Sequence, residues 1–214
     1  MPMPAGYQRL AVAVALALSL GPWGSLRATE TAPALSARSI EVCEQGREAT
    51  DRDVREHDFT EGLMLAEQAV ALDDENAAAH FAVFCNMGEI MRLDGESISS
   101  VFQFRRLMTE LNRALELDPD YTRAMASKGI LLVRLPRLLG GDDAHGERLL
   151  RRVIEIDPSA VSSRLMLAEQ CRQRGEMAEA SAFAQRALEI ASEQGRPDKV
   201  EEAQSILAKI STNH

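Results

Sequence analysis

The chain has 214 residues, of which 45% are hydrophobic and only 4% aromatic, so we expect a core of aliphatic side chains and alanine. The 27% of charged residues argues against intrinsic disorder, and the net charge of −9 disfavours nucleic acid as a partner. Three cysteines are too few for a disulfide-stapled scaffold, so the fold must rest on packing.

The first residues of the chain have the pattern of an export signal. Arg9 precedes an uncharged apolar run of eleven residues that ends at Leu20. A membrane-spanning helix needs roughly 20 apolar residues, so this run fits the hydrophobic region of a secretory signal better. We therefore expect a signal peptide over residues 1–28, a linker over 29–38 and an exported, periplasmic protein. The alternative is an uncleaved anchor, which would supply the only membrane contact.

The rest of the chain repeats one pattern of alanine and aliphatic residues that ends on an acidic or proline turn. The four copies cover residues 66–73, 111–119, 151–158 and 184–190. Val153 and Ala187, at matching places in the last two copies, lie 34 positions apart. That spacing is the period of a tetratricopeptide helix-turn-helix unit. The earlier intervals are longer, which predicts insertions in repeats 2 and 3.

The residues at the repeated positions resemble those of the tetratricopeptide repeat (TPR) family. In that family a small residue recurs where the two helices of a unit cross, and an Asp-Pro-like turn ends the unit. Here the third unit offers Gly129, the fourth offers Ala168, Ala180 and Ala187, and the turns are Asp118-Pro119 and Asp157-Pro158. The corresponding positions are Thr50 and Gly62 in the first unit, and Phe84 and Leu107 in the second.

The resemblance implies an all-α fold over residues 39–211: a right-handed superhelical stack of about four antiparallel helix pairs with a C-terminal capping helix. In chain order, the predicted helices cover residues 39–56 and 59–72, 77–93 and 98–117, 122–135 and 144–156, 160–174 and 177–192, and 198–210. The second helix of the second pair is longer than usual. We expect its added side chains, Ile98, Val101 and Phe102, to be buried against a neighbouring helix or against another chain.

The stretch 135–143 interrupts the third unit. Proline ends a helix, glycines allow backbone angles that other residues avoid, and aspartate caps a helix start. We interpret four residues as a structural turn and cap, with a ligand or partner loop as the alternative: Pro136, Gly140, Gly141 and Asp142. Leu-Pro followed by Gly-Gly-Asp also resembles exported TPR proteins that include the T-component of some TRAP (tripartite periplasmic) transporters.

No group of residues in the sequence has the spacing of a catalytic or metal site. The four histidines fall on separate predicted elements, and none stands near a serine or cysteine at a motif spacing. His80 and Cys85 project from different faces of one predicted helix. Helix capping accounts for the crowded acids around His145. We therefore expect no enzymatic activity, no metal and no cofactor.

The cysteines are predicted to be free and buried. Aligned on the repeats, Cys43 and Cys85 are offset by about eight residues on parallel helices, or about 12 Å along the axis. A disulfide needs α-carbons within about 7 Å, so this offset excludes the bond.

The TPR resemblance implies a groove, lined by the first helix of each pair, that holds a peptide or protein. Positions carried over from the family are Glu44, Arg47, Asp51, Phe81, Glu89, Arg123, Ile130, Arg134, Leu165, Glu169 and Arg172. The partner-binding candidates among them are Arg47, Phe81, Glu89, Arg123, Arg134, Glu169 and Arg172. Arg123, Arg134 and Arg172 are predicted to cluster and bind carboxylates of an acidic peptide or a C-terminus. The alternative is that these arginines are solvated or paired with nearby acids.

The resulting functional hypothesis is a non-enzymatic exported scaffold that binds a protein partner in its groove. The second hypothesis is a transporter accessory subunit that oligomerises and contacts a small organic anion or its binding protein.

Overall fold

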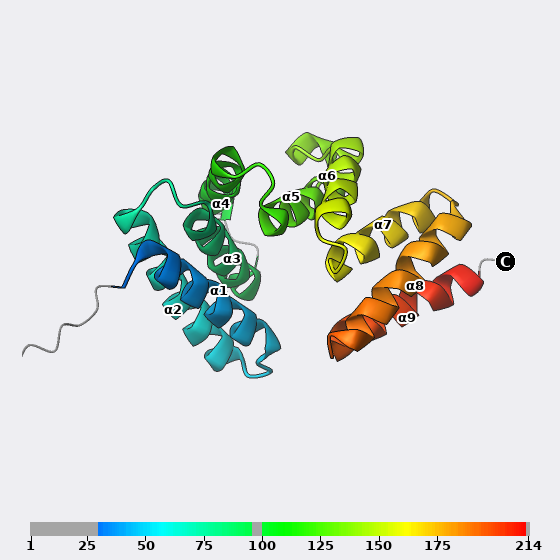
Figure 1. Cartoon of the computed structure of the whole chain (residues 1–214), viewed down its shortest axis with the longest axis horizontal. Helices are drawn as coiled ribbons and strands as arrows, with labels where there is room; N and C mark the ends of the chain where they lie inside the picture. The colour runs from blue at the N-terminus through cyan, green and yellow to red at the C-terminus, as the bar shows by residue number, and fades with distance from the viewer. Residues whose placement is uncertain (1–29, 96–99, 213–214) are drawn as a thin grey trace, which may run out of the picture.

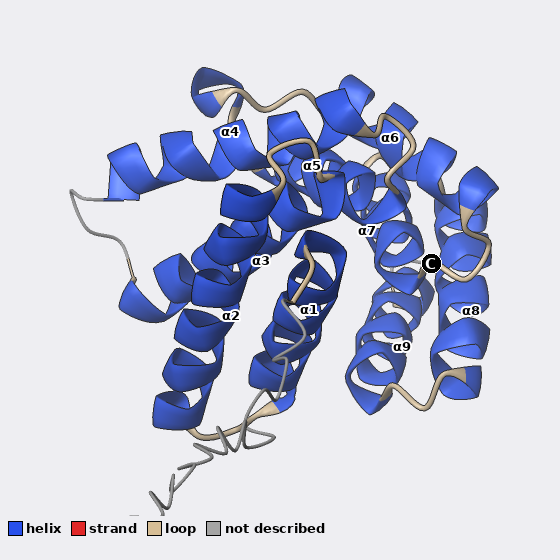
Figure 2. Cartoon of the chain, turned by 60° about the vertical axis from the view of Figure 1, so that its left-hand side comes forward, coloured by secondary structure: helices blue, strands red, loops and turns tan. Residues whose placement is uncertain are grey.

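The computed structural model describes residues 30–95 and 100–212, and all regular secondary structure in these residues is helical (Figure 2). The predicted signal peptide lies outside the described residues. The elements are α1 (Ala32–Glu48), α2 (Arg52–Leu72), α3 (Ala77–Asp94), α4 (Ser100–Leu117), α5 (Thr122–Arg134), the 3-10 turn η1 (Arg137–Leu139), α6 (Asp143–Ile156), α7 (Val161–Gln173), α8 (Met177–Glu193) and α9 (Pro197–Ser211).

Each helix packs against the next one along the chain, and the pairs follow one another along an arc (Figure 1). The pairs are α1 with α2, α3 with α4, α5 with α6, and α7 with α8, and α9 covers α7 and α8. The first helices also meet, because α1 contacts α3 and α5 contacts α7. This arrangement confirms the predicted all-α stack of helix pairs with a capping helix at its C-terminal end.

The first helix begins seven residues earlier than predicted, at Ala32 instead of residue 39. The Thr31 hydroxyl accepts a hydrogen bond from the Ala34 amide, and Pro33 stands in the first turn, where it loses no backbone hydrogen bond. Leu35 is buried. The prediction of a linker over 29–38 was therefore wrong for residues 32–38, which belong to the folded domain.

The first helix also ends earlier than predicted, because Asp51 caps α2. Its carboxylate accepts hydrogen bonds from the amides of Asp53 and Val54. Thr50 consequently lies in the loop, and Gly46 takes its place at the helix crossing. A Cβ atom on Gly46 would lie 2.6 Å from Cε1 of Phe59, which is closer than carbon atoms approach.

Small residues bring the helices of the third and fourth pairs together, as predicted. A Cβ on Gly146 would lie 2.7 Å from the Gly129 carbonyl oxygen, so α5 and α6 touch backbone to backbone. In the fourth pair Ala168, Ala180 and Ala187 are fully buried.

The expected burial of Phe102 against a neighbouring helix was wrong, because its surface is 76% exposed in this chain, and burial against another chain stays a prediction. Ile98 and the side chain of Val101 lie outside what the structure describes. The buried stripe of α4 begins further along, at Leu107, and continues with Leu111 and Ala114. Among the described residues, no helix is both long enough and apolar enough to cross a membrane.

Candidate partner-binding surface

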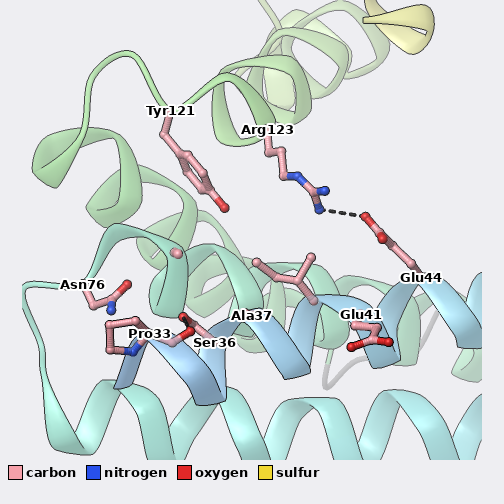
Figure 3. Close-up of a pocket in the computed structure, with 10 residues that line it drawn as sticks. Pro33, Ser36, Ala37, Glu41, Glu44, Asn76, Tyr121 and Arg123 are labelled. Atoms are coloured by element: carbon pink, nitrogen blue, oxygen red, sulfur yellow. Dashed lines mark hydrogen bonds and ion pairs between the residues drawn. The ribbon is translucent and has the colours of Figure 1, made fainter. Parts of the chain in front are cut away.

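A pocket of about 390 Å³ lies between the first helices of the first three pairs (Figure 3). One wall is α1, and the starts of α3 and α5 form the other. Its lining residues are Pro33, Ser36, Ala37, Ile40, Glu41, Glu44, Asn76, Ala78, Tyr121 and Arg123. The pocket thus combines apolar side chains with three charged ones, Glu41, Glu44 and Arg123.

Local structure at two helix starts shapes this pocket. Asn76 caps α3, where its side-chain oxygen accepts a hydrogen bond from the Ala79 amide at 3.1 Å. Tyr121 precedes α5 and packs edge-on against Phe81, with ring centroids 5.3 Å apart and planes at 89°. Burial raises the pKa of the Tyr121 phenol above its ordinary value. Phe81 itself is 5% exposed, so this predicted partner-binding residue supports Tyr121 from the core instead of facing the groove.

The charges of the pocket are mostly acidic. Arg123 donates a hydrogen bond from Nη1 to Oε1 of Glu44 at 2.7 Å, and both side chains are half exposed (Figure 3). Glu41 adds a second exposed carboxylate on the same helix. The pocket therefore carries two carboxylates and one guanidinium, and the guanidinium is already paired with Glu44.

The three arginines that were predicted to cluster stand apart. Arg123 and Arg134 lie at opposite ends of α5, and Arg134 is exposed. Arg172, near the end of α7, donates two hydrogen bonds to Glu169, at 2.9 and 2.6 Å. These hydrogen bonds lower the pKa of the Glu169 carboxyl to about 2. Arg123 and Arg172 follow the alternative expectation, since each is paired with an acid.

The candidates Arg47 and Glu89 form one buried contact between α1 and α3. Arg47 donates from Nε to Oε1 of Glu89 at 2.7 Å and from Nη2 to the sulfur of Cys85 at 3.3 Å. Glu89 is only 2% exposed, whereas about half of the Arg47 side chain is accessible. Of this pair, Arg47 alone offers surface to a partner.

Cys43 and Cys85 lie against each other, contrary to the predicted offset of about 12 Å along the helix axis. They share a small core cluster with Phe59. The expected offset failed because α1 begins at Ala32, which places Cys43 deeper in the helix than a start at residue 39 does. All three cysteines are free and buried, as predicted.

The stretch after α5 forms a turn and a cap. Gly140 has φ of +90°, a conformation that favours glycine, and the Gly141 amide donates to the Pro136 carbonyl at 3.1 Å. A Cβ on Gly141 would overlap the Leu135 carbonyl. Asp142 caps α6 by accepting a hydrogen bond from the His145 amide at 2.9 Å, which lowers the pKa of the Asp142 carboxyl. These contacts account for the Gly-Gly-Asp motif without a ligand.

Two other predicted groove residues have structural roles, since Asp51 caps α2 and Leu165 is in the core. The sequence analysis missed most of the pocket: Pro33 and Ala37 were assigned to the linker, and Tyr121 was not singled out. The Thr31-x-Pro33 sequence was the available signal, because it marks a capped helix start.

A cluster of possible metal ligands that the sequence did not suggest occurs at α7 and α8. Donor atoms of Cys171, Glu176 and Glu179 lie within 4.8 Å of one another. However, Glu176 is paired with Arg174 at 2.7 Å and Glu179 with Arg151 at 2.8 Å. Both carboxylates are thus already engaged by cations.

Solved structures similar to this chain support the fold, whereas family models and curated proteins give no match. No protein-family model matches the chain, and no curated protein matches it. Among solved structures, TTC0263, a thermophilic TPR protein of Thermus thermophilus, is similar with a TM-score of 0.55 and 18% identity, covering 82% of this chain and 92% of that one. The crystal structure of MamA is similar with a TM-score of 0.49 and 16% identity, covering 78% and 82%. The likeness to TTC0263 and the ordered helix pairs show that the described part of the chain has the tetratricopeptide repeat fold.

Proposed function

We propose that the protein is a non-enzymatic scaffold whose pocket between α1, α3 and α5 binds a basic, partly aliphatic segment of a partner protein. The observation that carries the proposal is the lining of this pocket. Pro33, Ala37 and Ile40 offer apolar surface, while Glu41 and Glu44 offer carboxylates. Sites of this kind, mostly apolar with a few placed polar groups, are typical of ligand recognition.

The charge of the pocket selects the class of ligand. An acidic peptide, the ligand expected from the arginine pattern, would meet Glu41 and Glu44 and would have to compete with Glu44 for Arg123. A lysine or arginine side chain would gain attraction from Glu41, which forms no ion pair among the described residues, and would share Glu44 with Arg123. The net charge of −9 for the whole chain supports the same preference, because it attracts cationic segments at longer range.

A peptide-display selection on the purified chain tests the proposal. We expect enriched peptides to contain basic and aliphatic residues. Ala37→Arg, on the exposed face of α1, places bulk and positive charge in the pocket and should weaken binding of these peptides at least tenfold. The matched control is Ala178→Arg, at an exposed alanine of α8 that lines a separate hollow beside α9. This variant should bind as the unmodified chain does.

Three results would contradict the proposal. One is enrichment of acidic peptides, and the second is binding that Ala178→Arg abolishes while Ala37→Arg does not. The third is a rise in melting temperature with small organic anions that Ala37→Arg leaves unchanged, which would instead favour the transporter accessory subunit.

We also propose that the scaffold acts outside the cytoplasm, in the periplasm. The support is the apolar run that ends at Leu20. Residues 1–28 fused to a reporter enzyme that is active only after export should give activity, and replacing Leu16 by Arg should abolish it. Equal activity of both fusions would contradict export.

A further inference from the structure

A pair of buried thiols lies between the first helices of the first two pairs. Cys43 on α1 is fully buried, and Cys85 on α3 is 4% exposed. The two side chains pack in one core cluster with Phe59. One helical turn further along, the contact between Arg47 and Glu89 also joins α1 to α3 and keeps the two helices aligned.

The charge beside the pair distinguishes its two sulfurs. Arg47 donates from Nη2 to the Cys85 sulfur at 3.3 Å and makes no such contact with Cys43 among the hydrogen bonds of the described residues. The hydrogen bond from Cys43 and the positive charge of Arg47 lower the pKa of Cys85 below its ordinary value. Donation to Cys85 and burial raise the pKa of Cys43. Cys85 therefore has the character of an attacking thiolate and Cys43 that of a thiol that keeps its proton.

The third cysteine provides a contrast within the same chain. Cys171 lies in the α7–α9 core, where burial and the nearby Glu179 raise its pKa to about 11. Among the described residues, no second cysteine belongs to that core cluster. Cys171 therefore lacks both the lowered pKa and the adjacent thiol.

We propose that Cys43 and Cys85 form a modification site, at which a small peroxide oxidises the two thiols to a disulfide between α1 and α3. The Cys85 thiolate attacks one oxygen of hydrogen peroxide, the O–O bond breaks, and the hydroxide that leaves takes up a proton to become water. Cys43 sulfur then attacks the resulting Cys85 sulfenic acid and displaces its hydroxyl, which leaves as water with the proton of Cys43. Two thiols lose two electrons and two protons, and one peroxide becomes two waters.

The disulfide would change the inner face of the first two helix pairs. It would join α1 to α3 covalently and remove the thiolate that Arg47 contacts. The accessible half of Arg47 would then keep Glu89 as its one partner in this cluster. Oxidation therefore changes the contacts of a half-exposed arginine on α1, whatever ligand the pocket between α1, α3 and α5 binds.

The test uses the full, reduced chain in native buffer with hydrogen peroxide. After alkylation in denaturant, peptide mapping should show a cross-link between the peptides that hold Cys43 and Cys85, while Cys171 is still alkylated. Dithiothreitol should restore all three thiols. A Cys171→Ala variant should give the same cross-link at the same rate. Arg47→Gln should slow the reaction about tenfold, because the thiolate loses its cation. Arg92→Gln is the matched control, since Arg92 contacts Glu89 but is not a partner of Cys85.

The proposal fails if the cross-link forms only after unfolding in urea. It also fails if Cys171 is oxidised while Cys43 and Cys85 can still be alkylated. An unchanged rate in Arg47→Gln would overturn the thiolate step, because that step depends on the adjacent cation.

Discussion

The two ends of the helix stack are packed with different kinds of side chain. The core of α7, α8 and α9 consists largely of fully buried alanines, such as Ala168, Ala184 and Ala187, together with a few aliphatic residues. The core of α1, α2 and α3 contains the ring of Phe59 and a set of buried polar groups. Asn86 donates to the Ser39 hydroxyl at 2.9 Å, and Ser39 donates to the Gly62 carbonyl at 2.6 Å.

The difference shows that neighbouring helices in this fold can be aligned in two ways, by close packing of small residues or by hydrogen bonds between buried side chains. At the C-terminal end, missing side chains let the helices approach, and the spacing of small residues sets the packing. At the N-terminal end, hydrogen bonds of Ser39 and Asn86 join α1, α2 and α3 through the core, and removing one partner would leave a buried polar group unpaired at a cost in stability. We therefore expect truncation of the buried ring to weaken the N-terminal end, and enlargement of the buried alanines to weaken the C-terminal end.

The largest effect is expected from Phe59→Ala in α2. Phe59 is fully buried, so its truncation leaves a cavity and should cost about 3–5 kcal/mol. Hydrogen exchange followed by mass spectrometry should show lost protection in α1–α3 and unchanged protection in α7–α9. Phe102→Ala is the control, because that ring is 76% exposed and should change stability by less than about 0.5 kcal/mol. Equal loss of protection at both ends would mean that the stack unfolds as one unit.

Ala187→Leu in α8 is expected to lower the free energy of unfolding by about 1–3 kcal/mol, less than Phe59→Ala does. Ala187 is fully buried, and added atoms must push the neighbouring helices apart. Protection should now fall in α7–α9 and stay unchanged in α1–α3. The same substitution at exposed Ala178 should be nearly neutral. A stable Ala187→Leu variant would show that the alanine core is loosely packed.

Arg47→Ala should cost about 1–2 kcal/mol, because Glu89 remains buried with one cation fewer. The value is below that of a fully buried pair, since Arg47 is half exposed and Arg92 still contacts Glu89 at 3.2 Å. Urea unfolding followed by circular dichroism measures the loss. Arg113→Ala removes an exposed ion pair with Glu116 and serves as the control. A cost no greater than that of the control would show that the α1–α3 contact does not set the register.

The smallest expected effect concerns how the stability of the C-terminal end depends on pH. The pKa of Glu169 is lowered to about 2 by its hydrogen bonds to Arg172, so its contribution is present at neutral pH and is lost as the pH falls from about 4.5 toward 2. Because the pair is near the surface, we expect it to contribute about 1 kcal/mol. Glu169→Gln should abolish that part of the acid-induced loss in urea titrations between pH 5 and 2. An identical pH profile for both chains would contradict the assignment.

The sequence determined the all-α class, the order of the pairs and the boundaries from α5 onward, because these depend on local signals. Alanine and glycine at the repeat spacing, the proline at 136 and the aspartate at 142 act within one helix or one turn. The end of α1 was missed because the residue that begins the next helix, the α2 cap Asp51, lies in a charged stretch without glycine or proline.

Only the tertiary structure decided which side chains meet. The Arg123–Glu44 ion pair joins residues 79 positions apart, and the Arg47–Glu89 contact joins residues 42 positions apart. Such pairings depend on the register between parallel helices, and an error of seven residues at the start of α1 separates Cys43 from Cys85. Helix formation is governed by neighbours along the chain, whereas the pocket and the thiol pair are governed by how whole helices align.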